Sequence, residues 1–268
     1  MGGDVHIVTS AGSVVSVVAK EHIRAGSEAD ADKVLEKLDL NISQSGNEVV
    51  ASATYESGVG FHFGSWPPVQ VDFVITAPAS ASAELKTSGG DVKVGDLEGA
   101  VRARTSGGDI KLGSIGGEVD ASTSGGNVSL VEGRGTVKLS TSGGNVTAER
   151  IVGPADLRTS GGDIKIESVE NTLTAQTSGG DVKAGFKGAL KGDCELSTSG
   201  GEVKAMVSRD AAFHLDAATS GGEVNASGLT ITIDRGGTGR SSLSGQVNGG
   251  GPLLKLRSSG GNIDVVTR

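Results

Sequence analysis

Residues 87–92 read Thr87-Ser88-Gly89-Gly90-Asp91-Val92, and this phrase decides the fold because it returns along most of the chain. Its pattern is Thr-Ser-Gly-Gly, then Asp, Glu or Asn, then Val or Ile, and it starts at Thr87, Thr105, Thr123, Thr141, Thr159, Thr177, Thr198 and Thr219, with a variant at Ser258. The first five steps are 18 residues long and the next two are 21. A fixed period of this length is typical of a solenoid, in which each repeat forms one coil stacked on the last.

Each repeat contains two short runs in which apolar and polar residues alternate. Val92 and Val94 alternate with Asp91 and Lys93, and residues 101–105 repeat the pattern. Alternation with period two predicts two strands, each with one face inward. Glycine-rich segments separate the runs, and we expect them to supply the positive φ angles of sharp corners. Because no segment between repeats is long enough for a crossover helix, successive coils must stack as parallel strands, about 4.8 Å apart.

Equivalent positions of successive repeats form columns. The residue after the acid is always aliphatic and predicts one buried column: Val92, Ile110, Val128, Val146, Ile164, Val182, Val203, Val224 and Ile263. The threonines share this inward parity, which predicts a ladder of hydroxyls bonding from coil to coil. Outward pairs such as Asp109 and Lys111 indicate charge neutralisation within a coil, because stacked like charges repel.

These patterns predict an all-β, single-stranded parallel β-helix of about ten coils of 18–21 residues. The whole chain, 1–268, is expected to be one domain, with irregular coils and a cap over 1–86, regular repeats over 87–227 and irregular coils over 228–268. One short helix is predicted near residues 28–38, capped by Ser27 and laid over the core or the end of the stack. Strands are expected at about 38–44 and 48–54, a degraded repeat at 244–248, and segments 253–256 and 262–266 should close the rod.

Aromatic residues gather between residues 55 and 73, which hold five of the seven in the chain: Tyr55, Phe61, Phe63, Trp66 and Phe73. A solenoid needs its open end covered, because an exposed coil edge invites aggregation. The segment is therefore interpreted as a hydrophobic cap. The alternative is a recognition loop in which Phe61, Phe63 and Trp66 bind a glycan or a partner protein.

Composition limits the functional classes. The net charge of −8 and the pI near 5.1 disfavour a nucleic-acid partner, whose binding needs a basic face. No apolar run of 18 residues exists that would predict a membrane span. The single cysteine, Cys194, has inward parity and is interpreted as a buried filler. The start at Met1-Gly2-Gly3-Asp4 already echoes the repeat, which indicates a chain trimmed from a longer exported precursor.

Motifs for chemistry were sought and none emerged. The repeat unit Gly-Gly-Asp-Val-Lys lacks the second Gly-x-Asp of calcium-binding β-rolls, and the four histidines stand far apart, so neither a metal nor another cofactor is predicted. Corners of four or five residues leave no cleft walled by long loops, as a polysaccharide lyase or hydrolase would need. No Gly-x-Ser-x-Gly elbow is present. We therefore predict no catalytic residues.

Several of these segments together resemble a known family. The opening strand pair, the short helix, the Val-x-Phe-x-Ile-x-x-Pro segment from Val71 to Pro78 and the serial Ser-Gly-Gly-Asp-Val units are similar to the putative-adhesin domain of bacterial envelope proteins. The ending, from Gly249-Gly250-Gly251-Pro252 to Asn262-Ile263, resembles the end of that domain. The likeness covers essentially the whole chain. It implies a right-handed parallel β-helix that is exported or faces the outside of the cell, and it brings no catalytic residues, because the family's molecular function is unknown.

The functional expectation is a non-enzymatic, exported or cell-envelope β-helix that acts as an adhesin or structural interaction module. Its partner would be a protein or glycan at the cell surface, and copies could associate through the solenoid ends. The alternative is a glycan-binding or polysaccharide-processing β-helix.

Overall fold

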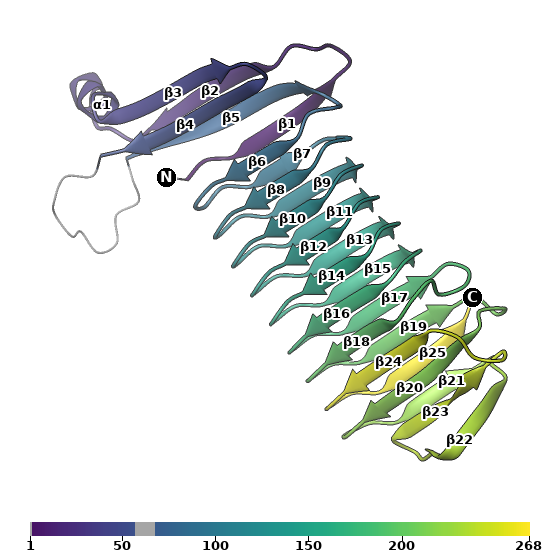
Figure 1. Ribbon diagram of the computed structural model, residues 1–268. Helices are drawn as coiled ribbons and strands as arrows, with labels where there is room; N and C mark the ends of the chain where they lie inside the picture. Colours follow the sequence, from purple (N-terminus) through teal and green to yellow (C-terminus); the bar gives the residue numbers. More distant parts are fainter. Residues whose placement is uncertain (1, 57–67) are drawn as a thin grey trace.

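The computed structural model describes residues 2–56 and 68–268, which form a rod of two long β-sheets that widens at its N-terminal end (Figure 1). Sheet I consists, in spatial order, of β2 (Ser16–Ile23), β5 (Val69–Pro78), β1 (Val5–Ser10), β7 (Val92–Val94), β9 (Ile110–Ile115), β11 (Val128–Gly133), β13 (Val146–Ile151), β15 (Ile164–Val169), β17 (Val182–Phe186), β19 (Val203–Val207), β25 (Ile263–Thr267) and β21 (Val224–Ser227).

Sheet II consists, from the C-terminal end of the rod upward, of β22 (Ile231–Thr238), β23 (Ser242–Val247), β20 (Phe213–Thr219), β24 (Leu253–Ser258), β18 (Cys194–Thr198), β16 (Leu173–Thr177), β14 (Ala155–Arg158), β12 (Val137–Ser140), β10 (Val119–Ser122), β8 (Val101–Arg104) and β6 (Ala83–Lys86). A separate hairpin joins β3 (Leu38–Ser45) to β4 (Glu48–Tyr55), and α1 (Glu28–Leu35) precedes it.

The regular coils confirm the all-β parallel solenoid. Each coil contributes one strand to each sheet, and Ile110 lies between Val92 and Val128 in parallel register. All three side chains are fully buried. The alternation of the sequence therefore reports the core directly: the apolar residues of both sheets face each other, and residues of like position in neighbouring coils are in contact.

The threonine ladder is also confirmed. From Thr105 to Thr219 the first residue of each phrase is only 5–8% exposed. The Thr123 hydroxyl donates to the carbonyl of Gly108 in the preceding coil at 2.9 Å. Thr141, Thr159 and Thr177 repeat this bond to Gly126, Gly144 and Gly162. Each corner is thus tied to the coil before it by a buried side chain, which satisfies a backbone carbonyl that has no strand partner.

The reason predicted for the corner glycines is wrong. Among the described glycines, positive φ angles occur at Gly3, Gly46, Gly188, Gly228, Gly249 and Gly250, and no second glycine of a Thr-Ser-Gly-Gly phrase is among them. What requires glycine there is the close approach of successive corners: a Cβ on Gly126 would lie 2.1 Å from the carbonyl oxygen of Gly108. A Cβ on Gly125 would have 3.4 Å to its nearest neighbour.

The acids that follow the glycines bond mainly to backbone rather than to lysine. The N–H of Asp109 donates to Oδ1 of Asp91 in the preceding coil at 2.8 Å, and the N–H of Asp181 donates likewise to Asp163. Ion pairs of the predicted kind join Lys111 to Asp109 and Lys183 to Asp181. Lys165, by contrast, pairs with Glu167 and not with Asp163 as predicted. An acid or asparagine recurs here because its side-chain oxygen accepts the next coil's N–H.

At the C-terminal end the order of the coils departs from the order of the sequence. β24 lies between β18 and β20, and β25 lies between β19 and β21. The prediction that segments 253–256 and 262–266 close the rod is therefore wrong, because these segments form its penultimate coil. Residues 244–248 do not form a degraded repeat either, because β23 runs antiparallel to β20 and, with β22, forms the end of sheet II (Figure 1).

The charges of the outward side chains in sheet II favour this insertion. In sequence order Glu195 of β18 would stack on Asp216 of β20, whereas the observed register places Lys255 between them. Lys255 pairs with Glu195 at 3.1 Å. In sheet I, Asn262 likewise separates Glu202 from Glu223, and its Oδ1 accepts the N–H of Glu223. Like charges directly opposite each other destabilise a strand pair, so the outward column of sheet II favours the inserted coil over the direct one.

At the N-terminal end a strand is also inserted out of sequence order, and the two sheets then end at different levels. β1 is inserted between β5 and β7, and β2 ends sheet I antiparallel to β5. Sheet II stops earlier, at β6, so β1, β5 and β2 have no strand of sheet II opposite them. The β3–β4 hairpin stands on that side (Figure 1). α1 keeps the predicted Ser27 cap and ends at Leu35. It lies at the N-terminal end of the rod (Figure 1) and has no buried residue, so of the two predicted placements, over the core or at the end of the stack, the first is wrong.

Candidate functional site

The aromatic residues predicted to bind a partner, Phe61, Phe63 and Trp66, lie outside the described residues. The residues that flank this segment in the sequence contribute to a candidate binding site. A groove of about 930 Å³ lies at the open N-terminal end of the rod, and β1, β2, β4, β5, β6 and β8 all contribute to its lining. Its volume is in the range of sites that hold a ligand or a short peptide segment.

The walls of the groove are apolar. From sheet I the inward side chains of Ile7, Phe73 and Ile75 reach it, and the half-buried residues Val49, Ala51 and Ala53 line it from β4. Leu85 of β6 forms part of the floor and is 7% exposed. The groove is the continuation of the solenoid core beyond the last coil that has strands on both sides.

One side of the groove is a strand edge. Ala83 and Thr87 donate their N–H groups to the carbonyls of Ala100 and Arg104, so these residues bond toward β8. In a strand the backbone groups of successive residues point to alternate sides, so Glu84 and Lys86 direct theirs away from β8. Within residues 2–56 and 68–268, β6 pairs with β8 alone. The N–H and C=O groups of Glu84 and Lys86 therefore face the groove without a strand partner.

The rim of the groove is charged. The Nζ of Lys86 lies 2.5 Å from Oε1 of Glu84. This contact holds the pKa of the Glu84 carboxyl below its ordinary value, with a smaller contribution from the arginines of β8. Arg102 and Arg104 themselves turn to Asp120 on β10, at 3.2 Å each. Asp120 thus has two cations, whereas Glu84, at the end of the same column, has one.

The N-terminal end also exposes most of the large apolar side chains of the described surface. Val8, Val14, Val18, Ile42, Val50 and Val74 are each at least 40% exposed, and elsewhere in the described chain only Val131 and Ile233 reach that exposure. Exposed apolar side chains gathered in one region mark interaction sites. Together with the groove, these residues define what we term the N-terminal head: residues 2–56 and 68–87.

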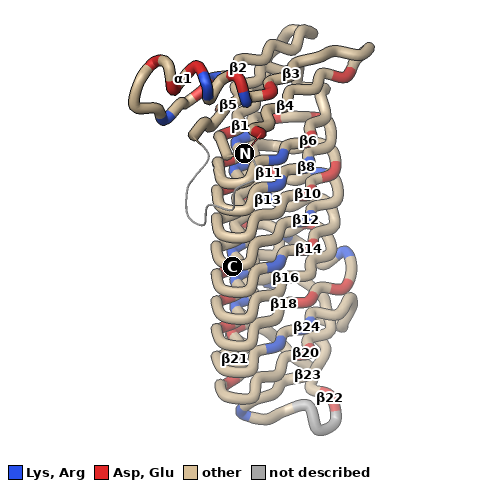
Figure 2. The backbone as a smooth tube through the Cα atoms, turned by 90° about the vertical axis from the view of Figure 1, so that its left-hand side faces the viewer, with Lys and Arg blue, Asp and Glu red and all other residues tan. Residues whose placement is uncertain are grey.

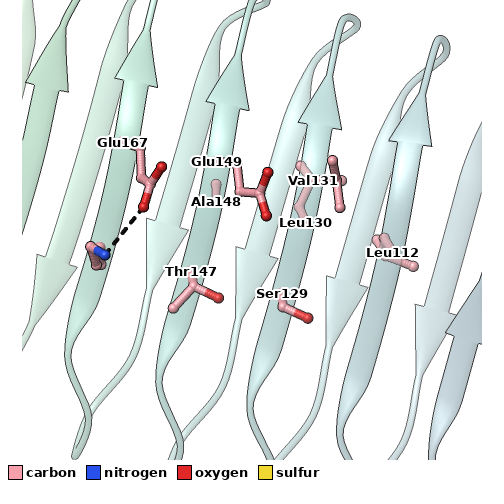
Figure 3. A pocket seen from close by; sticks show the side chains of 9 residues that line it. Leu112, Ser129, Leu130, Val131, Thr147, Ala148, Glu149 and Glu167 are labelled. Atoms are coloured by element: carbon pink, nitrogen blue, oxygen red, sulfur yellow. Dashed lines mark hydrogen bonds and ion pairs between the residues drawn. The ribbon is translucent and has the colours of Figure 1, made fainter.

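A second, smaller hollow of about 270 Å³ lies on the outer face of sheet I (Figure 3). Ser129 and Thr147 interrupt a column of lysines there, and Glu149 and Val131 lie along the next column (Figure 3). Lys165 is already paired with Glu167 across its edge. Residues of both charge signs are distributed along the rest of the rod (Figure 2). This hollow has neither the volume of the groove nor its free strand edge.

Three carboxyl groups of the rod, those of Glu132, Glu170 and Asp181, have pKa values below the ordinary value. Glu132 accepts hydrogen bonds from Arg134 and Arg150, and these arginines hold its pKa below the ordinary value. Arg150 lowers the pKa of Glu170, and the N–H of Glu202 with Lys183 lowers that of Asp181. A general acid needs a raised carboxyl pKa. The described residues contain no group of three His, Cys, Asp or Glu side chains placed to hold a metal ion.

We expect Cys194 to be almost unreactive in the folded protein. It is 3% exposed, and burial raises the pKa of its thiol to about 11. Relative to an ordinary thiol of pKa 9.0, this lowers the thiolate fraction at pH 8 about a hundredfold, because the thiolate is the reactive form. Labelling with a disulfide reagent at pH 8, with and without denaturant, measures this ratio. Fast labelling of protein that keeps its native circular dichroism would contradict the buried assignment.

The comparisons with known proteins agree with the repeat architecture. The model of the Toastrack DUF4097 family matches residues 118–266, more than half of the chain. The chain belongs to this family. The resemblance noted from the sequence motifs is thus confirmed for this toastrack chain. The matched region runs from the residue before β10 into the inserted strand β25. The groove of the N-terminal head lies almost entirely outside it.

A solved structure from Clostridium sporogenes, described as a putative cell adhesion protein, matches with 12% sequence identity and a TM-score of 0.21. The match covers 99% of this toastrack chain and 88% of that chain. No curated protein matches the sequence. No helix in the described part of the chain has the length and apolar character to cross a membrane.

The groove residues could not be selected from the sequence. The segment that attracted attention was the aromatic one, whereas Glu84, Leu85 and Ala53 sit in ordinary strand patterns. One signal was available: Glu84 begins the outward column of sheet II, and no earlier segment carries the repeat in that register. Once the inward columns of the two strands in each repeat are assigned to separate sheets, the lack of an earlier strand in this register predicts that β6 is the edge of sheet II.

Proposed function

We propose that this toastrack chain is a non-enzymatic, extracytoplasmic interaction module, in which a rigid rod carries an adhesive head at its N-terminal end. The observation that carries the proposal is the groove in the N-terminal head, with its apolar walls and exposed strand edge. Surfaces of this kind bind polypeptide partners by burying apolar area and pairing backbone groups. The regular rod supports the same reading, because its repeated side chains are used in holding one coil to the next.

The extracytoplasmic location is supported by the resemblance of the sequence motifs to the putative-adhesin domain of bacterial envelope proteins. On this proposal the length of the rod separates the head from whatever holds the other end. The rod is stiff because every coil is bonded to its neighbours through both sheets and the threonine ladder.

The experiment compares two variants of neighbouring residues on β4. Ala53→Lys places a charge in the groove, whereas Thr54→Lys places it on the exposed, opposite face of the same strand. Fluorescently labelled protein is incubated with intact cells of the source organism and retention is measured by flow cytometry. We expect Thr54→Lys to bind as the unchanged protein does and Ala53→Lys to lose most of the retention.

Protease treatment of the target cells identifies the class of partner. Loss of retention after protease treatment is expected for a polypeptide partner. Retention that survives protease but falls after glycosidase treatment would favour the glycan-binding alternative. Equal retention of both lysine variants, or no retention of the unchanged protein, would overturn the proposal.

A further inference from the structure

We infer that the groove of the N-terminal head binds an extended strand of a partner polypeptide, added to the edge of β6, with a lysine or arginine facing Glu84. The inference rests on the proposed function and specifies the chemistry of the partner. Three independent features of the described residues carry it: the sign of a charge column, the free backbone groups of β6 and the shape of the apolar walls.

The outward column of sheet II is ordered by charge. From β6 toward the C-terminal end its members are Glu84, Arg102, Asp120, Lys138, Asp156, Thr174, Glu195, Lys255 and Asp216. Within this series of parallel strands, the neighbours of each charged member are residues of opposite charge or the neutral Thr174. The inserted coil follows the same alternation, since Lys255 lies between Glu195 and Asp216. The position beyond Glu84 is the next in this series, and by the same rule it takes a cation.

Glu84 has the capacity for that cation. Among the described residues its ion pair is with Lys86, on the same strand. Arg102, its neighbour in the column, pairs with Asp120 instead. Asp120 accepts two arginines at once, which shows what a carboxylate of this column does inside the rod. A strand beside β6 would give Glu84 the second cation that Asp120 already has.

The backbone of β6 selects an extended polypeptide as the occupant. The N–H and C=O groups of Glu84 and Lys86 face the groove at the spacing of a strand, and an added strand would satisfy them. The chain itself contains two examples of such strand addition, because β1 and the β24–β25 coil each pair with strands far from them in sequence. A glycan or a small molecule would leave most of these groups without partners.

The walls define the inward side of the strand. Ala83 and Leu85 alternate with Glu84 along β6, so an added strand would alternate in the same way. Its inward side chains would contact Ile7 and Phe73 of sheet I and Ala51 of β4. The partner segment therefore has apolar residues at alternate positions, a basic residue between them opposite Glu84, and a polar or acidic residue opposite Lys86.

The chain contains a segment with this pattern that serves as the probe. Residues 135–144, Gly-Thr-Val-Lys-Leu-Ser-Thr-Ser-Gly-Gly, form β12 and its corner. Stacked on β6 in the register of the rod, this peptide would place the residue equivalent to Lys138 opposite Glu84 and Ser140 opposite Lys86. The synthetic peptide, labelled at its N-terminus, is titrated with the full chain and followed by fluorescence anisotropy. A second peptide carries Glu in place of that lysine.

We expect saturable binding of the lysine peptide and about five- to tenfold weaker binding of the glutamate peptide, as attraction turns to repulsion. Glu84→Gln should remove the difference between the two peptides, and Glu84→Lys should reverse it. Glu149→Gln, an exposed change in the middle of sheet I, should leave it unchanged. Circular dichroism checks that each variant is folded, and Glu84→Gln decides the matter even where Glu84→Lys does not fold.

Absence of saturable binding overturns the inference, and so does equal binding of the two peptides or a preference that Glu84→Gln leaves intact. These outcomes are separable from failure of the proposed function. If Ala53→Lys abolishes retention on cells while the peptides bind equally, the head binds its partner by other chemistry. If the peptides discriminate while the unchanged protein is not retained on cells, the strand site exists and the adhesive function is wrong.

Discussion

Removal of residues 251–268 is expected to unfold the C-terminal third of the rod. The deletion removes β24 and β25, whose Leu254, Leu256, Ile263 and Val265 are all 0% exposed. Each buried aliphatic side chain contributes roughly 1.5–3 kcal/mol, so their loss approaches the total stability of a domain, about 5–15 kcal/mol. A move of β20 onto β18 is disfavoured, because it would place Asp216 directly opposite Glu195.

Limited proteolysis followed by mass spectrometry measures this effect. We expect new cleavage between residues 208 and 250 and a lower midpoint of thermal unfolding, while the coils from β6 to β17 stay protected. A synthetic peptide of residues 251–268, added in trans, should restore protection because it refills the missing coil. The same cleavage pattern and unfolding midpoint in truncated and full-length protein would show that the inserted coil is not structural.

Gly126→Ala should destabilise the rod, whereas Gly125→Ala should not. A Cβ at residue 126 would lie 2.1 Å from the carbonyl oxygen of Gly108, and the other atoms nearest to it, Gly108 C and Asp109 N, are also backbone, so they have little room to shift. Forcing extra volume into a packed site costs about 1–3 kcal/mol, which corresponds to a fall in Tm of roughly 2–12 °C for a chain of this size. At residue 125 the nearest atom would be 3.4 Å away, and the φ angle lies outside the left-handed region.

Gly125→Ala is therefore the matched control, one residue away with the same chemical change. Because alanine restricts the unfolded chain more than glycine does, the control should be neutral or stabilising by up to about 1 kcal/mol. Thermal and urea unfolding of both variants measure the difference. If both variants were destabilised equally, glycine would be needed for backbone freedom rather than for the close approach of the corners.

The regular part of the fold was predictable because it depends on local patterns repeated many times. Strict alternation around Val92 and Val94 determines which side chains are inward, and the 18-residue period determines which residues stack. Even the threonine ladder followed from parity alone. The exact bonding did not: whether Asp109 accepts a backbone N–H or a lysine depends on distances between coils that a single repeat does not encode.

The two ends of the rod were not predictable from the repeat. Sequence order favoured β20 as the neighbour of β18, and only the charges of Glu195, Lys255 and Asp216 argued otherwise. α1 has a correct cap and an apolar stripe, yet no strand of the rod lies beneath it. The groove exists because sheet I receives β1, β5 and β2 beyond the coil where sheet II ends, and that inequality arises from long-range pairing.

By itself, the sequence determined the solenoid, its inward columns, the polar corners and the family to which the chain belongs, because each is a local pattern summed over many coils. Only the tertiary structure decided the order of the terminal coils, the need for glycine at the second corner position and the open edge of β6. These depend on which distant segments meet, and a one-dimensional period does not specify contacts between strands separated by tens of residues or the charges that those contacts bring together.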